Sequence, residues 1–245
     1  MKDAIKRVLH GVGLYAPARA LYRTVNRAHR EERRLRREFF AQFVSPGDLC
    51  FDIGANVGQS IEALRACGGS VVALEPNPHC QPALRHQFSA DPKVTLVEEA
   101  VGDRPGKATL HFSGTAATAS LRADWNRRDD QTVEVEIVTL DQLIAAHGAP
   151  KLLKVDVEGS ELQVFLGLGR AVPIIYFEMH AREIEVVGRI LARLGRLGRI
   201  EGVNAISEDH STWLWPDWAP LDDFMGRMAQ PPTVANVVVR MQTAS

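Results

Sequence analysis

The sequence lacks the features that mark secreted, membrane-spanning or polyanion-binding proteins. It has three cysteines, Cys50, Cys67 and Cys80, an odd number without metal-like spacing. We therefore expect reduced thiols in a cytoplasmic protein rather than a disulfide framework. No window approaches the ~18 consecutive apolar residues of a transmembrane segment, and the N-terminus has no secretory signal pattern. A formal net charge of −1 argues against a nucleic-acid partner for the chain as a whole.

Charge is distributed unevenly along the 245 residues. Residues 1–40 carry eleven Lys or Arg against four Asp or Glu, and an intermittent apolar stripe runs through this segment. We predict a basic helical N-terminal arm over residues 1–44, packed on the domain with its charges in water. The alternative is peripheral contact of residues 1–42 with an anionic membrane surface.

Residues 45–245 show short β-branched runs alternating with helical patterns. This alternation predicts an α/β fold, doubly wound, with a mostly parallel sheet of the seven-stranded type and helices on both faces. An inserted β-hairpin is expected at about 107–138, and further strands at roughly 198–205, 211–215 and 233–241. The strands predicted for the parallel core are 49–53, 70–75, 93–98, 151–156 and 172–178.

The first predicted strand ends on Asp52 and is followed at once by a turn containing Gly54 and Gly58. Glycines there admit a ligand close to the backbone and tolerate positive φ. The dinucleotide fingerprint G-x-G-x-x-G is absent, and a carboxylate would repel a pyrophosphate. Glu75, at the end of the second strand, is suited to both hydroxyls of a ribose, in nicotinamide and adenosyl cofactors alike.

Five segments, in order, resemble the FkbM family of S-adenosylmethionine-dependent methyltransferases, which have a class I, Rossmann-like fold. The resemblance covers roughly residues 45–216 and depends most on the segment K-V-D-V-E-G-S-E-L. The segments are D-I-G-A-N-V-G (52–58), L-E-P-N-P (74–78), T-L-D (139–141), L-L-K-V-D-V-E-G-S-E-L (152–162) and Y-F-E-M-H (176–180).

The resemblance implies S-adenosyl-L-methionine as the cofactor, with the glycine turn at its methionine part and Glu75 on its ribose. Residues near the adenosine would be Asn77, with Glu99 and Ala100 after the third strand. The complete cofactor-binding set is Asp52, Gly54, Ala55, Asn56, Gly58, Glu75, Asn77, Glu99 and Ala100.

Catalysis is expected at the ends of the fourth and fifth strands, where Asp156, Glu178 and His180 would share one cleft. One of them would remove the acceptor's proton or position the acceptor. Alternatively, Asp156, Glu158, Glu178 and His180 would bind Mg²⁺ or Mn²⁺, which lowers the pKa of a bound hydroxyl. Lys154 is expected in a structural ion pair with a strand-end acid.

The function predicted from these residues is methylation of a hydroxyl on a small molecule, a sugar or a glycan. Two alternatives from other classes are an NAD(P)-dependent oxidoreductase and a non-catalytic cofactor-binding partner protein. Segment 113–131 is a candidate lid, and the tryptophans after residue 212 are expected in core or hairpin packing. The sequence predicts neither the acceptor nor the oligomeric state.

Overall fold

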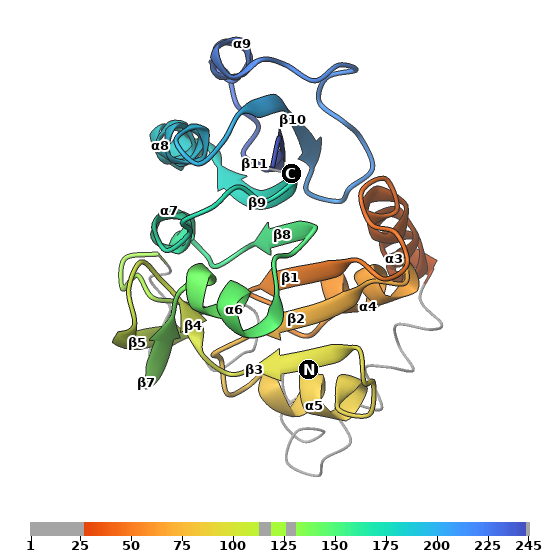
Figure 1. Ribbon diagram of the computed structural model, residues 1–245, viewed down its shortest axis with the longest axis vertical. Helices are drawn as coiled ribbons and strands as arrows, with labels where there is room; N and C mark the ends of the chain where they lie inside the picture. The colour runs from red at the N-terminus through yellow and green to blue at the C-terminus, as the bar shows by residue number, and fades with distance from the viewer. Residues whose placement is uncertain (1–26, 113–118, 126–130, 244–245) are drawn as a thin grey trace, which may run out of the picture.

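A computed structural model describes residues 27–112, 119–125 and 131–243. Its centre is a seven-stranded sheet of order β10-β11-β9-β8-β1-β2-β3 (Figure 1). The neighbours from β9 to β3 are parallel, whereas β11 runs antiparallel to both β9 and β10. The predicted α/β fold is confirmed. The strands are β1 (Leu49–Ile53), β2 (Ser70–Leu74), β3 (Val94–Val97), β8 (Leu152–Val155), β9 (Ile174–His180), β10 (Ile200–Ser207) and β11 (Val234–Met241).

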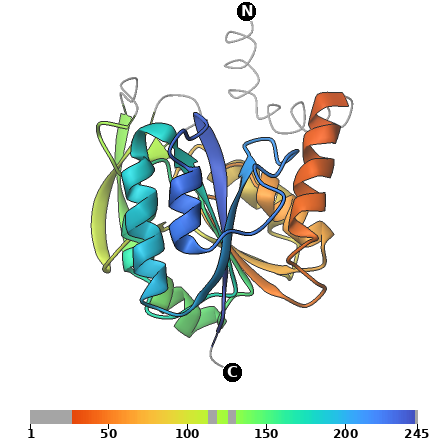
Figure 2. The same cartoon turned by 90° about the horizontal axis from the view of Figure 1, so that it is seen from above.

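Helices cover both faces of this sheet (Figures 1 and 2). One face packs against α3 (Arg27–Phe40), α4 (Gln59–Ala66) and α5 (Gln81–Phe88). The other packs against α6 (Leu140–His147), α7 (Glu161–Leu166) and α8 (Ile184–Gly195). Because side chains alternate along a strand, β8 and β9 direct their apolar side chains to both layers. Their polar side chains lie on the face of α3 and α4.

The predicted insertion forms a second sheet beside the first. Its hairpin strands, β5 (Gly106–Phe112) and β7 (Gln131–Val138), pair antiparallel as expected. Two short strands, β4 (Ala100–Val101) and β6 (Ala119–Ser120), complete the order β4-β7-β5-β6. Most of the predicted lid, at 113–118 and 126–130, lies outside the described residues.

Three local predictions differ from the structure. Strand β9 continues to His180, two residues beyond its predicted end, because β11 pairs with it along its whole length. The strand expected at 211–215 is reduced to one isolated bridge at Trp213, whose ring packs on Trp218 at 5.4 Å between ring centroids. Helix α9 (Leu221–Arg227) was not predicted; it begins after Pro220 with two aspartates in its first turn.

The end of the predicted arm packs into the domain. Phe39, Phe40, Phe43 and Val44 are buried in the same apolar cluster as β1, β2 and β9. Residues 1–26 lie outside the described part, so the division into an arm and a domain, and contact of the arm with a membrane, stay predictions. Among the helices of the described ranges, none combines the length and apolarity needed to cross a bilayer.

Candidate active site

The glycine turn after β1 is shaped by its contact with the end of β8. Gly54 has φ +81°, and a Cβ atom there would lie 1.8 Å from the carbonyl oxygen of Asp156. Only glycine lets the two backbones approach so closely. Asn56, two residues on, also has positive φ (50°). Its backbone N–H donates to Glu75, the residue that follows β2.

Gly58, predicted at the methionine part of the cofactor, packs against a neighbouring helix. It precedes α4 with φ +87°, and a Cβ atom there would lie 2.3 Å from the ring of Phe88 on α5. Gly58 lines neither of the two cavities described below. Its small size therefore serves helix packing.

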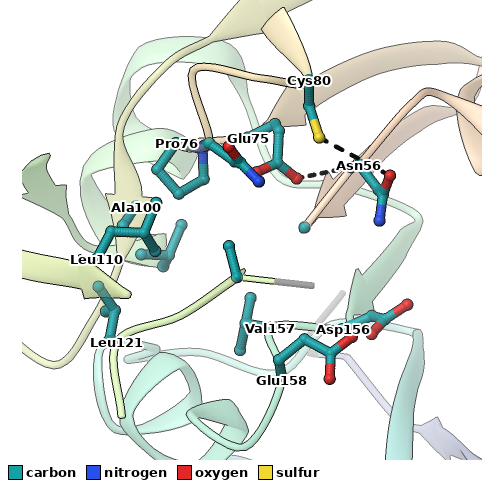
Figure 3. A pocket seen from close by; sticks show the side chains of 14 residues that line it. Asn56, Glu75, Pro76, Cys80, Ala100, Leu110, Leu121, Asp156, Val157 and Glu158 are labelled. Carbon is teal, nitrogen blue, oxygen red and sulfur yellow. Dashed lines mark hydrogen bonds between the residues drawn. The ribbon is translucent and has the colours of Figure 1, made fainter. Parts of the chain in front are cut away.

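Glu75 is the anchor of the first cavity. Its side chain is buried, and its carboxylate accepts hydrogen bonds from the backbone N–H groups of Asn56 (2.7 Å) and Asn77 (2.9 Å). Burial raises the pKa of this carboxyl group to about 7, against the effect of both hydrogen bonds. These two hydrogen bonds join three predicted cofactor residues, of which Figure 3 shows Glu75 and Asn56.

The first cavity is a narrow slot with one polar and one apolar side (Figure 3). Glu75 and Asn77 form the polar side, and Ala100, which was predicted, lies on the apolar side. Glu99 is half-exposed and does not line the slot, because the chain turns between β3 and β4. Lining residues that the sequence did not single out are Pro76, Cys80, Val101, Leu110, Ala119, Leu121 and Val157.

Asp52 lies beneath the glycine turn and lines neither cavity. It is fully buried, 3.0 Å from the Nζ atom of Lys154, which also lies 3.4 Å from Asp156 and donates to the carbonyl oxygen of Gly54. Burial lowers the pKa of Lys154, but the two carboxylates outweigh it and raise the pKa above its usual value. The expected structural ion pair of Lys154 is confirmed.

Glu158, Glu178 and His180 converge beside the turn. One potential ligand atom from each lies within 4.8 Å of the other two, and Nε2 of His180 is 3.0 Å from Oε2 of Glu178. Glu178 raises the pKa of His180 through this hydrogen bond. Burial raises the pKa of Glu158 to about 7. Asp156, the fourth predicted metal ligand, is not a member of this group.

A strap formed by residues 119–125 of the insertion holds this group from outside. Nε1 of Trp125 donates to Oε2 of Glu158 at 2.8 Å, and the hydroxyl of Ser120 donates to the Glu158 carbonyl oxygen at 2.7 Å. The indole centroid is 5.0 Å from that of His180. A Cβ atom at Gly159 would lie 2.2 Å from the indole. The sequence predicted a candidate lid over 113–131, but no motif pointed to Trp125.

A second cavity of about 850 Å³ opens on the other side of the turn. Four residues line both cavities, namely Gly54, Asn56, Asp156 and Glu158. Predicted residues on its wall also include Ala55 and Glu178, whereas His180 is not among its lining residues. The lining residues that the sequence did not single out are Glu32, Arg36, Gln59, Ser60, Tyr176, Ser207, Glu208, Asp209, His210, Ser211 and Asn236.

Tyr176 and His210 form one wall of this cavity. The tyrosine hydroxyl and Nε2 of His210 are 2.8 Å apart, and both side chains are buried. Burial, together with the charge of Arg36, lowers the pKa of His210 to about 3, so its imidazole is neutral near pH 7. The sequence assigned His210 no role because it lies outside every motif.

Comparison with known proteins identifies relatives of the chain. Residues 52–202 match the family described as "Methyltransferase FkbM domain". The hexuronic acid methyltransferase AglP of Haloferax volcanii is 26% identical over 140 residues, which cover 55% of this chain and 56% of the relative. The 31-O-demethyl-FK506 methyltransferase FkbM of Streptomyces tacrolimicus is 30% identical over 156 residues, 50% of this chain and 60% of the relative. The chain therefore spans little more than half the length of each curated relative it matches.

Two solved structures illustrate how distant the structural matches are. A TehB-like S-adenosylmethionine-dependent methyltransferase from Corynebacterium glutamicum gives a TM-score of 0.48 at 13% identity, covering 85% of this chain and 88% of that chain. A precorrin-6y C5,15-methyltransferase from Geobacter metallireducens gives a TM-score of 0.45 at 13% identity, covering 85% and 87%.

Proposed function

The chain belongs to the FkbM family of S-adenosylmethionine-dependent methyltransferases, and from that premise we propose that it methylates a hydroxyl oxygen on a sugar, a glycan or another small molecule. One observation carries this proposal. A narrow slot and a wide polar cavity meet at a wall shared by Gly54, Asn56, Asp156 and Glu158. The arrangement suits a donor in the slot and an acceptor in the wide cavity.

The slot fits the adenosine part of the cofactor by its chemistry. Glu75 is buried with both oxygens fixed by backbone N–H groups, and its remaining lone pairs suit a pair of ribose hydroxyls. The apolar side suits an adenine ring. When bound, S-adenosylmethionine supplies an electrophilic methyl group on a positively charged sulfur. Asp156 and Glu158, at the shared wall, would favour that positive charge.

Glu178 and His180 are the proposed proton acceptors. In the transfer, the acceptor oxygen forms a bond to the methyl carbon, the carbon–sulfur bond breaks with its electron pair going to sulfur, and the hydroxyl proton must leave. Glu178, which lines the wide cavity, takes this proton, and His180, whose Nε2 lies 3.0 Å from Oε2 of Glu178, shares it and stabilises the result. Asp156 would position the acceptor hydroxyl at the shared wall.

Glu158, Glu178 and His180 also support a metal-assisted form of the same reaction. Two carboxylates and an imidazole are ligands that Mg²⁺ or Mn²⁺ accepts, and their atoms are close enough to share one ion. These three residues would hold the ion, which would supply a Lewis acid that lowers the pKa of the acceptor hydroxyl. The two forms differ in their response to chelation.

The names of the two curated relatives support an oxygen acceptor. One acts on a hexuronic acid, and the other on a 31-O-demethyl compound. The oxidoreductase alternative is disfavoured because Phe88 occupies the space at Gly58 and carboxylates surround the turn where a pyrophosphate would lie. The paired Glu178 and His180 argue against a partner protein without catalytic activity.

A screen of methyl transfer from isotopically labelled S-adenosylmethionine to hydroxylated metabolites and glycans, with and without EDTA, tests the proposal. We expect incorporation into an oxygen of at least one acceptor, and its loss in Asp156→Ala and in Glu178→Ala. Full transfer by both variants would refute the assignment of the site. Activity lost with EDTA and restored by Mn²⁺ or Mg²⁺ would support the metal-assisted form.

Calorimetric titration tests the donor slot independently of any acceptor. The full chain is expected to bind S-adenosylmethionine and not NADPH. Glu75→Gln is expected to weaken binding roughly tenfold or more, or ~1.4 kcal/mol, because it replaces one hydroxyl-accepting oxygen by an amide donor. Glu98→Gln is the matched control, since Glu98 is an exposed strand-end acid paired with Arg85.

A further inference from the structure

Part of the wide cavity's wall lies outside residues 52–202, the stretch that matches the family (the family stretch). Helix α3 contributes Glu32 and Arg36, and the loop after β10 contributes Ser207 to Ser211. Both views of the fold bring this helix and this loop together (Figures 1 and 2). Residues 52–202 therefore form only part of the cavity lining, and α3, the loop after β10 and Asn236 supply the rest of the described lining.

We propose that Arg36 binds the methyl acceptor and that the acceptor is an uncharged, hydroxyl-rich sugar residue. The inference rests on the proposed function, because it takes the wide cavity as the acceptor site. It goes further by naming a binding residue outside the family stretch and a charge class for the substrate.

The position of Arg36 is fixed by the packing of α3. Phe39 and Phe40, one turn along the helix, are buried against Tyr176 at 5.3 and 5.9 Å between ring centroids, and Phe39 also contacts His210 at 5.2 Å. These contacts tie the last turn of α3 to the Tyr176–His210 wall. Arg36, whose side chain is only 12% exposed, is thereby directed along the cavity wall rather than into solvent.

Most donor groups of Arg36 are available to a ligand. Its guanidinium has five N–H donors, and within the described residues its hydrogen bonding is confined to one contact, from Nη2 to Oε1 of Glu32 at 3.2 Å. Glu32 itself is also held by Gln59 of α4 at 3.4 Å. A fixed arginine beside a fixed carboxylate presents donors and acceptors side by side, which matches neighbouring hydroxyl groups of a sugar.

The balance of charge decides between a neutral and an anionic acceptor. Among the described residues of the lining, the cationic side chains are Arg36 and Lys154, and Lys154 is already paired with Asp52 and Asp156. The imidazole of His210 is neutral. An added carboxylate or phosphate would meet net repulsion, whereas hydroxyl groups can donate to these oxygens. The carboxylates of the lining are Glu32, Asp156, Glu158, Glu178, Glu208 and Asp209.

Saturation-transfer NMR on the full chain with S-adenosylhomocysteine bound tests the proposal without knowledge of the natural acceptor. The probes are D-glucose, D-galactose and D-mannose, with D-glucuronate and D-galacturonate as their acidic counterparts. We expect binding of at least one neutral sugar, at least fivefold weaker binding of its acidic counterpart, and at least tenfold weaker binding of the neutral sugar to Arg36→Gln. Affinity for S-adenosylhomocysteine, measured by calorimetry, should change less than twofold.

Arg33→Gln is the matched control, because Arg33 lies on the same helix but pairs with Glu62 of α4; it should leave sugar binding unchanged. Arg36→Lys keeps the charge and should recover part of the binding, and unchanged thermal unfolding of the variants excludes misfolding as the cause. Stronger binding of the acidic sugars, no binding of any sugar, or full binding by Arg36→Gln would overturn the inference. Failure to bind S-adenosylhomocysteine would instead refute the proposed function.

Discussion

At the scale of single residues, the buried charges of the sheet govern both stability and site geometry. Lys154 lies between Asp52 and Asp156 and also donates to the carbonyl oxygen of Gly54. One ammonium group therefore neutralises a fully buried carboxylate and fixes the turn at the shared wall of the two cavities. Removal of Lys154 would leave the buried Asp52 without its ion-pair partner.

Lys154→Met is expected to destabilise the protein by about 3–5 kcal/mol, because it leaves the buried carboxyl group of Asp52 without its partner. The double variant Asp52→Asn/Lys154→Met should lose less than the single variant. Urea unfolding measures both. Lys107→Met, which breaks exposed contacts with Glu134 and Glu136, should leave the free energy of unfolding nearly unchanged. Equal losses for the single and double variants would contradict the pairing.

A second residue-scale prediction concerns pH. Glu161 accepts hydrogen bonds from the N–H groups of Val157 and Gly159 on the same oxygen, and burial raises its pKa from 4.5 to about 7. The folded state therefore binds more protons than the unfolded state between these values, so this group makes stability fall as pH rises from 4.5 through 7.

Glu161→Gln keeps the accepting oxygen and removes the titration. We expect the variant to lose less stability than the wild type between pH 5 and 8, by on the order of 2 kcal/mol, in denaturant unfolding at each pH. Glu185→Gln, an exposed acid in the first turn of α8, is the control and should leave the pH slope unchanged. Parallel slopes for Glu161→Gln and the wild type would argue against a buried titrating group.

At the scale of elements, the strap of residues 119–125 joins the two cavities. Ala119 and Leu121 line the slot, while Trp125 holds Glu158 through its indole N–H. The guanidinium of Arg182 also stacks over the indole of Trp125, with its Cζ atom 4.0 Å from the ring centroid. The strap is thus a structural connection between the donor slot and the acid group of the site.

Trp125→Phe should lower the rate constant of methyl transfer roughly tenfold or more, because a hydrogen bond to a charged group contributes about 1.5–3 kcal/mol. Affinity for S-adenosylmethionine should change less than threefold. Single-turnover transfer to the acceptor found in the screen and calorimetry measure these two quantities. Trp215→Phe, which alters packing against Phe224, serves as the control. A parallel fall in affinity and rate would point to general loss of structure.

The elements that could be predicted are those whose signals are local. Strand β1 and the Thr139 cap of α6, which forms a capping box with Gln142, follow from a few neighbouring residues. The continuation of β9 to His180 could not be predicted, because it depends on pairing with Val234, far along the chain. Within the site, Glu75 and Asn77 follow directly from their strand. Trp125 and Arg36 reach the site through tertiary contacts that no local pattern encodes.

At the scale of the whole molecule, α3 belongs to the hydrophobic core of the sheet. Phe39, Phe40, Phe43 and Val44 are each less than 10% exposed. Burial of such side chains stabilises a fold by roughly 1.5–3 kcal/mol each, and the total stability of a domain is about 5–15 kcal/mol. The last turn of α3 and the residues after it therefore account for a large share of the stability.

A chain that begins at residue 45 is accordingly expected to lose its cooperative thermal transition and to bind a hydrophobic dye. The buried face of Tyr176 and its neighbours would be exposed to water. Differential scanning calorimetry and dye fluorescence compare this chain with the full one. A matching point variant, Phe39→Ala, should lower stability by about 3–5 kcal/mol. An unchanged transition in the shortened chain would mean that the helix is a detachable arm.

The contribution of α3 to the wide cavity has a consequence for how homologous proteins diverge in evolution. Residues 52–202 hold Glu75, Glu178 and His180, so a lineage that preserves this stretch inherits the proposed donor-binding site and the proposed proton acceptor together. Glu32, Arg36 and the loop after β10 lie outside the stretch and can diverge on their own. Homologues that share the stretch are then expected to share a reaction while differing in what they methylate, and exchange of α3 together with that loop between homologues would transplant acceptor preference.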